Sequence, residues 1–149
     1  MKVIIKKFEE LNGKEVYEIG RLRSEVFVVE QKCLYLDLDG KDESSMHIYF
    51  LDETSEDIMC YCRVLRRGVS YETSSIGRVV TNPKYRGKGY ARKLLLEAID
   101  IVKNDFKDDG ITIGAQSYLK EFYGSLGFKA ISDVYDEDGI PHIDMNLKV

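Results

Sequence analysis

Apolar residues recur along this 149-residue chain with two different spacings, and each spacing predicts a different element. Short apolar runs rich in β-branched and aromatic residues are typical of strands. The last two runs flank Asp138 and Gly139, a pair typical of the tight turn of a β-hairpin. The predicted strands cover residues 3–8, 46–51, 58–65, 75–81, 111–115, 128–135 and 142–147.

Three other segments carry apolar residues every three or four positions, which is the spacing of an amphipathic helix. The first runs from residue 12 to about 31, and Asn12 and Glu15 at its start have the arrangement of a capping box. The second covers residues 88–105. The third is short and begins at Ser117, a residue type that caps helices well.

The order of these elements predicts a mixed α/β domain. The segment from residue 75 to residue 115 has the order strand, helix, strand, so we expect one right-handed crossover there. The chain has only two prolines, no internal repeat and no low-complexity linker. Residues 1–149 are therefore expected to form one domain, which is ordinary for this length.

Charge and hydropathy exclude several classes of protein. With 22 lysines and arginines against 26 aspartates and glutamates, the net charge is −4, which argues against a general affinity for nucleic acid or for an anionic membrane. No run of 18 apolar residues predicts a membrane-spanning helix, and the first apolar run is too short for a signal peptide. We expect a cytoplasmic protein with neither nucleic acid nor membrane as a partner.

Three cysteines raise the question of a metal site. An odd number of cysteines in such a chain favours reduced thiols over disulfides. Cys60 and Cys62 with Cys33 and His47 offer the ligand types of zinc, but a single C-x-C pair lacks the second matching pair of a zinc site. We interpret Cys60 and Cys62 as small buried side chains and expect no metal.

A loop dense in glycine and cations precedes the second predicted helix. Free N–H groups at a helix start favour bound phosphate, and glycine lets a phosphate approach the backbone closely. The chain has no Walker A string, and the dinucleotide fingerprint fails because Arg92 stands where its third glycine belongs. The alternatives left by the loop alone are a different phosphate site and an ordinary basic helix start.

Residues 86–91, RGKGYA, match the pattern [Q/R]-x-x-G-x-[G/A], and this stretch resembles the pyrophosphate loop of the GNAT (Gcn5-related) N-acetyltransferases. Residues 116–128, QSYLKEFYGSLGF, resemble the second signature of that superfamily. The segment LRSEVFVVEQKCLYLDLDGKD, followed by His47, IGRVVT and YDEDGIPHIDM, is similar in order to the ElaA-like subgroup over nearly the whole chain. One departure is Asp144, where a small residue is expected.

The resemblance implies a central, mostly antiparallel, splayed sheet of about six to seven strands with helices on both faces. It also implies an acetyl-CoA-dependent N-acetyltransferase whose acceptor is the primary amine of a small molecule or peptide, and a monomer or homodimer. Direct transfer is expected, because Cys60 and Cys62 lie far from the motifs and no other covalent carrier is evident. The alternative is a non-catalytic module that binds or senses acyl-CoA.

The resemblance also implies roles for single residues. Tyr123 corresponds to the general acid that protonates the departing thiolate, although a tyrosine that only packs beside Phe122 is the alternative. His142 and Glu30 are alternative general bases, His142 because imidazole exchanges protons near neutral pH. The implied contacts of coenzyme A are Val79, Val80, Arg86, Gly87, Lys88, Gly89, Tyr90, Ala91, Gln116 and Tyr123.

An acidic segment between the first helix and the next strand permits two interpretations. Asp37, Asp39, Asp42 and Glu43 occur within seven residues. They form either an ordinary solvated loop or a rim that attracts a cationic amine.

Overall fold

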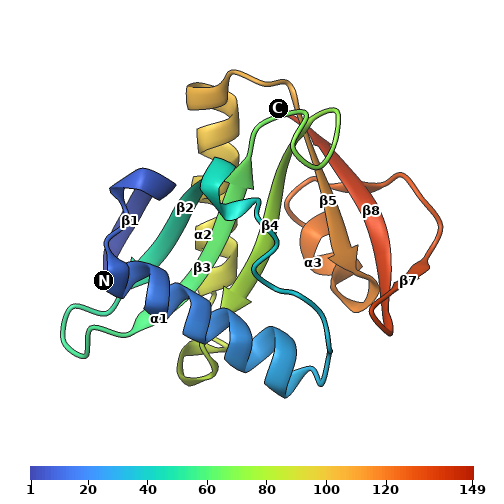
Figure 1. Cartoon of the computed structure of the whole chain (residues 1–149). Coiled ribbons are helices and arrows are strands. Elements are labelled where there is room, and N and C mark those ends of the chain that lie inside the picture. The colour runs from blue at the N-terminus through green and yellow to red at the C-terminus, as the bar shows by residue number, and fades with distance from the viewer.

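One twisted sheet of eight strands runs through the molecule (Figure 1). The computed structural model describes all residues from 1 to 149. The strands are β1 (Lys2–Lys7), β2 (Ser45–Leu51), β3 (Ile58–Leu65), β4 (Ser74–Thr81), β5 (Gly110–Gln116), β6 (Lys129–Ala130), β7 (Tyr135–Glu137) and β8 (Ile140–Lys148). Their order is β1-β2-β3-β4-β5-β8-β6, and β7 also pairs with β8. Only the β4–β5 pair is parallel, so the expected mostly antiparallel sheet is confirmed.

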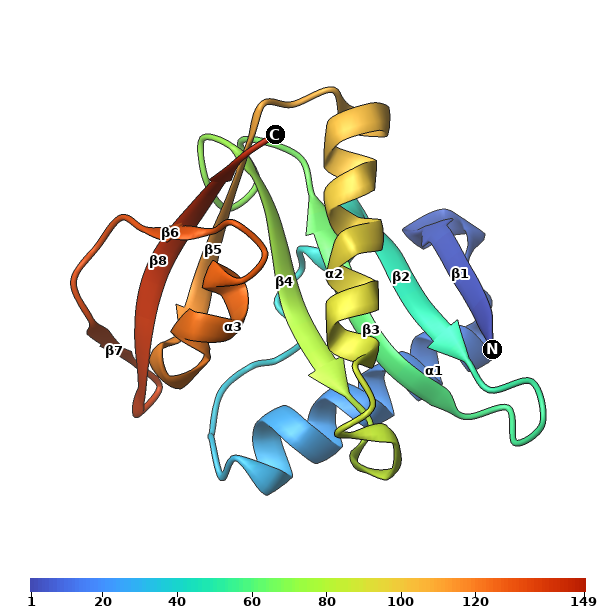
Figure 2. The ribbon, with the colours of Figure 1, turned by 180° about the vertical axis from the view of Figure 1, so that it is seen from behind.

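Helices cover both faces of the sheet (Figures 1 and 2). On the front face of Figure 1 lies α1 (Gly13–Arg23), which continues into a π-helical segment, Ser24–Glu30. On the back face lie α2 (Tyr90–Asp100), continued by the π-helical segment Ile101–Phe106, and α3 (Lys120–Gly124). No helix has both the length and the apolar character needed to cross a membrane. Single 3-10 turns occupy Phe8–Glu10, Asp42–Ser44, Pro83–Tyr85 and Ser117–Leu119.

The start of α1 confirms the capping box. The Asn12 side chain accepts a hydrogen bond from the Glu15 backbone N–H at 2.8 Å, and the Glu15 carboxylate accepts one from the Asn12 backbone N–H at 3.0 Å. Two N–H groups without partners inside the helix are thereby satisfied. Local sequence therefore determines where the long front helix begins.

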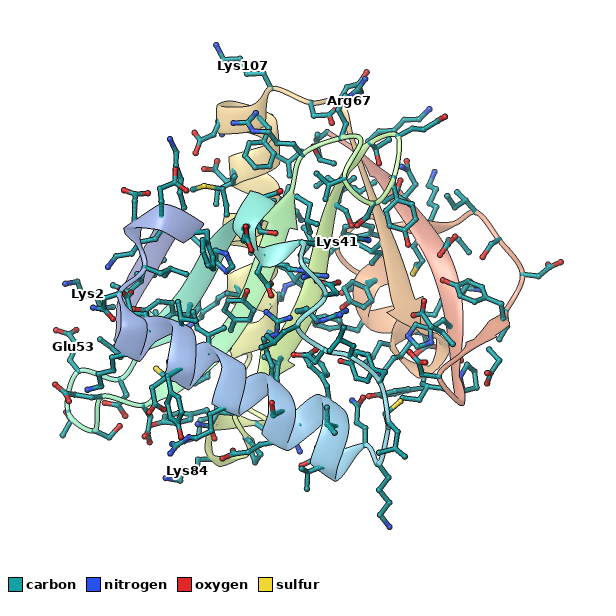
Figure 3. The ribbon with its side chains drawn as sticks, viewed as in Figure 1. Lys2, Lys41, Glu53, Arg67, Lys84 and Lys107 are labelled. Carbon is teal, nitrogen blue, oxygen red and sulfur yellow. The ribbon has the colours of Figure 1, made fainter.

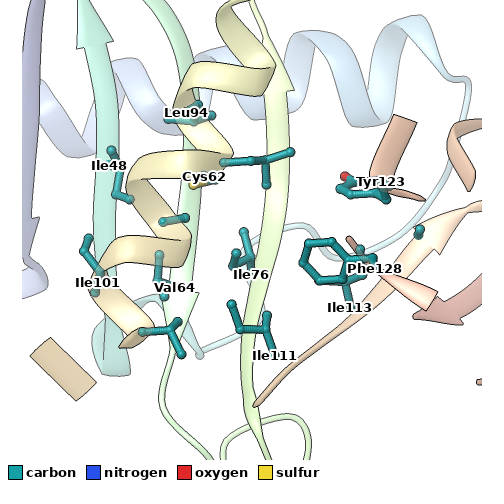
Figure 4. Close-up of a cluster of buried hydrophobic side chains, with 14 of the residues drawn as sticks. Ile48, Cys62, Val64, Ile76, Leu94, Ile101, Ile111, Ile113, Tyr123 and Phe128 are labelled. Carbon is teal, nitrogen blue, oxygen red and sulfur yellow. The ribbon is translucent and has the colours of Figure 1, made fainter. Parts of the chain in front are cut away.

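The two faces of the sheet bury separate apolar clusters. The larger cluster of 19 residues lies beneath α2, where Ile48, Cys62 and Val64 pack against Leu94 (Figure 4). The smaller cluster of seven residues, which includes Leu22, lies beneath α1. Burial of apolar surface on both sides holds the sheet between its helices.

The zinc candidates do not come together. Cys60 and Cys62 belong to the cluster beneath α2, as expected for small buried side chains. The His47 ring lies within hydrogen-bond distance of the Tyr61 hydroxyl (2.7 Å) and the Asp42 carbonyl (2.8 Å). Both ring nitrogens of His47 are therefore occupied by hydrogen bonds within the protein.

The predicted strand over 128–135 is wrong. Two short strands, β6 and β7, replace it, and both pair with β8 at different places. Between them the Ser132 hydroxyl accepts a hydrogen bond from the Asp144 backbone N–H at 2.9 Å. A serine side chain thus takes the place of a backbone partner and interrupts the ladder.

β4 and β5 pair only at one end. Ser74 and Ser75 lie opposite Ile111 and Thr112, and beyond them the two strands diverge (Figure 1). Residues of both strands line a cavity where the strands separate. The candidate functional site lies in that cavity.

Candidate functional site

A cavity of about 920 Å³, here called the central cavity, lies where β4 and β5 separate. Its walls come from both faces of the sheet, since Phe122 and Tyr123 belong to the back of the molecule and Tyr35 and His142 to the front. Its size suits a small-molecule ligand. The sequence-predicted site residues that line it are Glu30, Val79, Val80, Arg86, Ala91, Gln116, Tyr123 and His142.

A smaller hollow of about 230 Å³, the loop pocket, continues from the central cavity toward the start of α2. Arg86 and Ala91 line both, so the two spaces adjoin. Gly87, Gly89 and Tyr90 complete the predicted set there, and Lys88 of the same loop lines neither space.

The backbone of this loop requires glycine. Gly87 and Gly89 have φ angles of +76° and +80°, which side chains rarely allow. Nothing lies within 4 Å of the position that a Cβ would take at either glycine. Gly89 is the N-cap of α2 and has no side chain to cap the first turn. The N–H groups at the start of α2 are therefore open to an anion such as a diphosphate.

Two residues predicted to contact the ligand, Arg86 and Gln116, form hydrogen bonds with residues at the end of the front helical segment. Arg86 donates hydrogen bonds to the two carboxylate oxygens of Glu30 at 2.7 and 3.2 Å. Gln116 donates one to the side chain of Gln31 at 3.2 Å. Glu30 and Arg86 are each nearly half exposed, so their ion pair is open to exchange with other partners.

Tyr123 lies in the back wall with 6% of its surface exposed. Its ring packs edge-on against Phe122 and Phe128, with centroids 5.3 and 5.9 Å away. Burial, reinforced by the nearby Cys62 and Tyr118, raises the pKa of the phenol. Tyr123 is therefore a protonated donor at neutral pH.

A β-bulge shapes the edge of β4 beside the cavity. Tyr61 pairs with Val80 and Arg63 with Gly77, so two residues of β4, Arg78 and Val79, face a single residue of β3. Arg78 takes a φ of +53°, a conformation that is uncommon for residues other than glycine. A bulge of this kind takes backbone groups out of the ladder and turns them toward a neighbouring site.

His142 lies opposite Gln116 on the pair formed by β5 and β8. Its Nδ1 is 2.7 Å from the Ile140 carbonyl oxygen, so Nδ1 carries the proton that this oxygen accepts. Its Nε2 is 3.3 Å from a carboxylate oxygen of Glu137. The histidine is thus held by one nitrogen, while the other is the nitrogen able to take up a proton.

Three arginines and three aspartates form a network across the front face, here called the arginine–aspartate network. Arg23, only 1% exposed, donates from Nε to Asp37 at 2.8 Å and from Nη1 to Asp42 at 2.7 Å. The Arg63 guanidinium donates to both oxygens of Asp39 at 2.7 Å and holds the pKa of that carboxyl well below its usual range. The sixth member, Arg78, reaches Asp37 at 2.9 Å and Asp39 at 3.3 Å.

For Asp37, Asp39 and Asp42 this network replaces both interpretations of the acidic segment, whereas Glu43 is exposed, as in a solvated loop. Asp37 is 6% exposed, so it belongs neither to a solvated loop nor to a rim that meets a substrate. Its charge, like those of Asp39 and Asp42, is neutralised by arginine. The arginine partners were missed from the sequence, although Arg63 stands inside an apolar run, where a cation needs a carboxylate.

Comparison with known proteins agrees with this geometry. A sequence model of the family described as "Acetyltransferase (GNAT) domain" matches residues 9–149. A UPF0039 protein of Schizosaccharomyces pombe is 39% identical over 150 residues, covering 100% of this chain and 98% of that protein. The structure of an acyl-CoA N-acyltransferase from Pseudomonas aeruginosa superposes with a TM-score of 0.91 at 34% identity over 99% of both chains. The structure of Escherichia coli ElaA gives a TM-score of 0.91 at 33% identity over 98% of both.

Proposed function

Because the chain belongs to the GNAT acetyltransferase family, we propose that it transfers an acetyl group from acetyl-CoA directly to a primary amine. The observation that carries this proposal is a continuous space from the glycine loop at α2 to Tyr123 and His142. A long ligand can enter at the loop pocket and present its reactive end between the two side chains. The acetyl thioester supplies the activated acyl group.

Backbone groups hold most of the co-substrate in this proposal. The N–H groups at Gly89, Tyr90 and Ala91 bind the diphosphate, for which the open space above the glycines leaves room. Arg86 and the exposed Lys88 add positive charge. The pantetheine arm lies along β4 beside Val79 and Val80 and reaches Gln116, as a strand added to the open edge.

The reaction requires two proton transfers and one stabilised oxyanion. The amine gives up a proton and its nitrogen forms a bond to the thioester carbonyl carbon, whose oxygen becomes negative. A backbone N–H at the bulge of β4, near Val80, donates to that oxygen. The carbon–sulfur bond then breaks, and Tyr123 donates its proton to the departing thiolate.

His142 is assigned as the base in preference to Glu30. Nδ1 of His142 is held by the Ile140 carbonyl, so Nε2 is the nitrogen that takes the amine proton. The carboxylate of Glu137 at 3.3 Å stabilises the imidazolium that results. Glu30, by contrast, already binds Arg86 through both oxygens.

Two measurements on the purified protein test the proposed function. Calorimetric titration with coenzyme A should show binding, and Gly89→Val should abolish it, because valine strains a φ of +80° and fills the approach to the helix start. A panel of primary amines should then release free thiol from acetyl-CoA. A folded protein that binds no coenzyme A would overturn the proposal, while binding without amine-dependent thiol release would favour a non-catalytic acyl-CoA module.

A further inference from the structure

Three side-chain oxygens converge above Gly114, in the middle of β5. A Cβ at this glycine would lie 3.1 Å from the Tyr71 hydroxyl, 3.3 Å from the Tyr135 hydroxyl and 3.7 Å from a carboxylate oxygen of Asp144. Gly114 is nevertheless exposed and lines the central cavity together with Tyr71. The missing side chain therefore leaves a polar recess at the edge of the cavity. Tyr135 and Asp144 adjoin this recess at Gly114 without lining the cavity itself.

The hydrogen bonds of this recess leave acceptor capacity unused. The Tyr135 hydroxyl donates to Oδ1 of Asp144 at 2.6 Å, and no other donor reaches that carboxylate. No lysine, arginine or histidine forms an ion pair with Asp144. The Tyr71 hydroxyl bonds to no protein group, and burial together with the charges of Asp144 and Glu137 raises its pKa. The recess thus offers a negative carboxylate and a hydroxyl oxygen to an incoming donor.

Most other charges along the cavity are paired with an opposite charge, and Lys41 is an exception. The arginine–aspartate network balances three cations against three anions, and Glu30 balances Arg86. Lys41, in front of the sheet in Figure 3, contacts the Ser70 hydroxyl at 2.9 Å. The charge left uncompensated beside Gly114 is negative, from Asp144 and the largely exposed Glu137. A cation is the ligand group that such a recess attracts.

The recess stands at a defined distance from His142. Asp144 and His142 are two residues apart on β8 and point to the same face, about 7 Å along the strand. The Tyr135 ring lies beside the His142 ring, with centroids 6.1 Å apart and planes inclined by 27°. A nitrogen bound at Asp144 and an amine bound at His142 are therefore separated by about the length of an extended four-carbon chain.

From this arrangement we propose that the acceptor is a diamine or polyamine, whose second ammonium group binds Asp144 between Tyr71 and Tyr135. The inference rests on the proposed function and names the substrate class of the same site. The ammonium donates to the free carboxylate oxygen and to the Tyr71 hydroxyl, and the aromatic rings favour its charge. The other amine of the acceptor reaches His142 and accepts the acetyl group.

Three amines of equal chain length test the proposal: 1,4-diaminobutane, 1-aminobutane and 4-aminobutanoate. The wild-type protein should show a kcat/KM for the diamine at least about tenfold above that for 1-aminobutane, with 4-aminobutanoate the poorest. Asp144→Asn keeps an oxygen for Tyr135 but loses the charge, so the diamine-to-monoamine ratio should fall by about tenfold. Because both amines are compared within one variant, a general loss of activity cancels.

Asp133→Asn is the matched control, because Asp133 is exposed and only its backbone carbonyl forms a hydrogen bond, with the Ser132 hydroxyl. This variant should keep the wild-type ratio. An equal rate for diamine and monoamine, a preference for 4-aminobutanoate, or an equal fall in the control would overturn the diamine proposal while leaving acetyl transfer intact.

Calorimetry separates the two proposals if no amine is acetylated. 1,4-Diaminobutane is titrated into the protein with and without coenzyme A. Binding that Asp144→Asn weakens by about tenfold would support the recess even though the transferase activity fails. Absence of diamine binding would overturn the recess as a cation site.

Discussion

A buried phenol beside a reactive cleft is the residue on which the proposed chemistry depends most directly. Tyr123→Phe removes a single oxygen that bonds to no protein group, so the ring packing against Phe128 should survive. We expect kcat to fall by about a hundredfold, because a positioned general acid contributes on that order. The Kd for coenzyme A should change little.

Steady-state thiol release and calorimetry on the same preparation check this expectation. Tyr17→Phe on α1 is the control, since Tyr17 is 68% exposed and far along the helix from the cavity. Unchanged kcat in Tyr123→Phe would leave Tyr123 with a packing role alone.

The ion pair between Glu30 and Arg86 leads to a second prediction at this scale. Glu30→Gln should release Arg86 for the diphosphate and strengthen coenzyme A binding, by at most about fivefold because the pair is exposed. Calorimetric Kd values at two salt concentrations measure this. A fall of about a hundredfold in kcat would instead identify Glu30 as the base and remove that role from His142.

At the scale of elements, the arginine–aspartate network anchors the segment between α1 and β2 against the sheet. Arg23→Met should destabilise the protein by up to about 3–5 kcal/mol, because buried Asp37 loses one of its two arginine partners and Asp42 also loses one of two. Denaturant unfolding measures this change. Arg21→Met, two positions away on the same helix, breaks only the exposed contacts with Glu18 and Glu25 and should cost less than about 1 kcal/mol. Similar losses in both variants would contradict an anchoring role.

Features that depend on contacts between neighbouring residues could be predicted from the sequence. Features that depend on contacts between residues far apart in the chain could not. The start of α1 follows from Asn12 and Glu15, which lie three residues apart. The break between β6 and β7 depends on a bond from Asp144 to Ser132, twelve residues away, and no periodicity reports such a partner. Arg63 and Asp39 are 24 residues apart, so the spacing of residue types along the chain does not predict their pairing either.

At the scale of the whole molecule, only some of the residues around the candidate site could be predicted from the sequence. Resemblance to a family located residues on β4, α2, β5 and β8 that the fold brings to one cavity. It could not locate Tyr71 and Tyr135, which converge only because the sheet places Gly114 beside them. The polar recess follows from packing across strands, so it required the structure.

The molecule as a whole should lose stability in acid in two stages, and the first stage belongs to His47. Burial holds the pKa of His47 below its ordinary value of 6.5, and its two nitrogens are occupied by the Tyr61 hydroxyl and the Asp42 carbonyl. In the unfolded chain this histidine takes a proton as the pH falls below about 6.5, whereas in the folded chain it stays neutral. The unfolded state then binds more protons, so stability is full above that pH and falls as the pH decreases, by at most about 1.4 kcal/mol per pH unit.

The second stage follows at lower pH, because arginine partners hold the pKa values of Asp39 and Asp108 below their ordinary range. These carboxylates stabilise the fold above about pH 4 and lose that effect as they are protonated. Thermal unfolding between pH 7.5 and pH 3 should therefore show one decline that begins near pH 6.5 and a steeper one below pH 4. His47→Gln should be less stable at pH 7.5 but should show a flat profile down to about pH 5, while keeping the acid decline. If the decline near pH 6.5 persisted unchanged in His47→Gln, the first stage would belong to another titrating group, because this substitution removes the imidazole of His47.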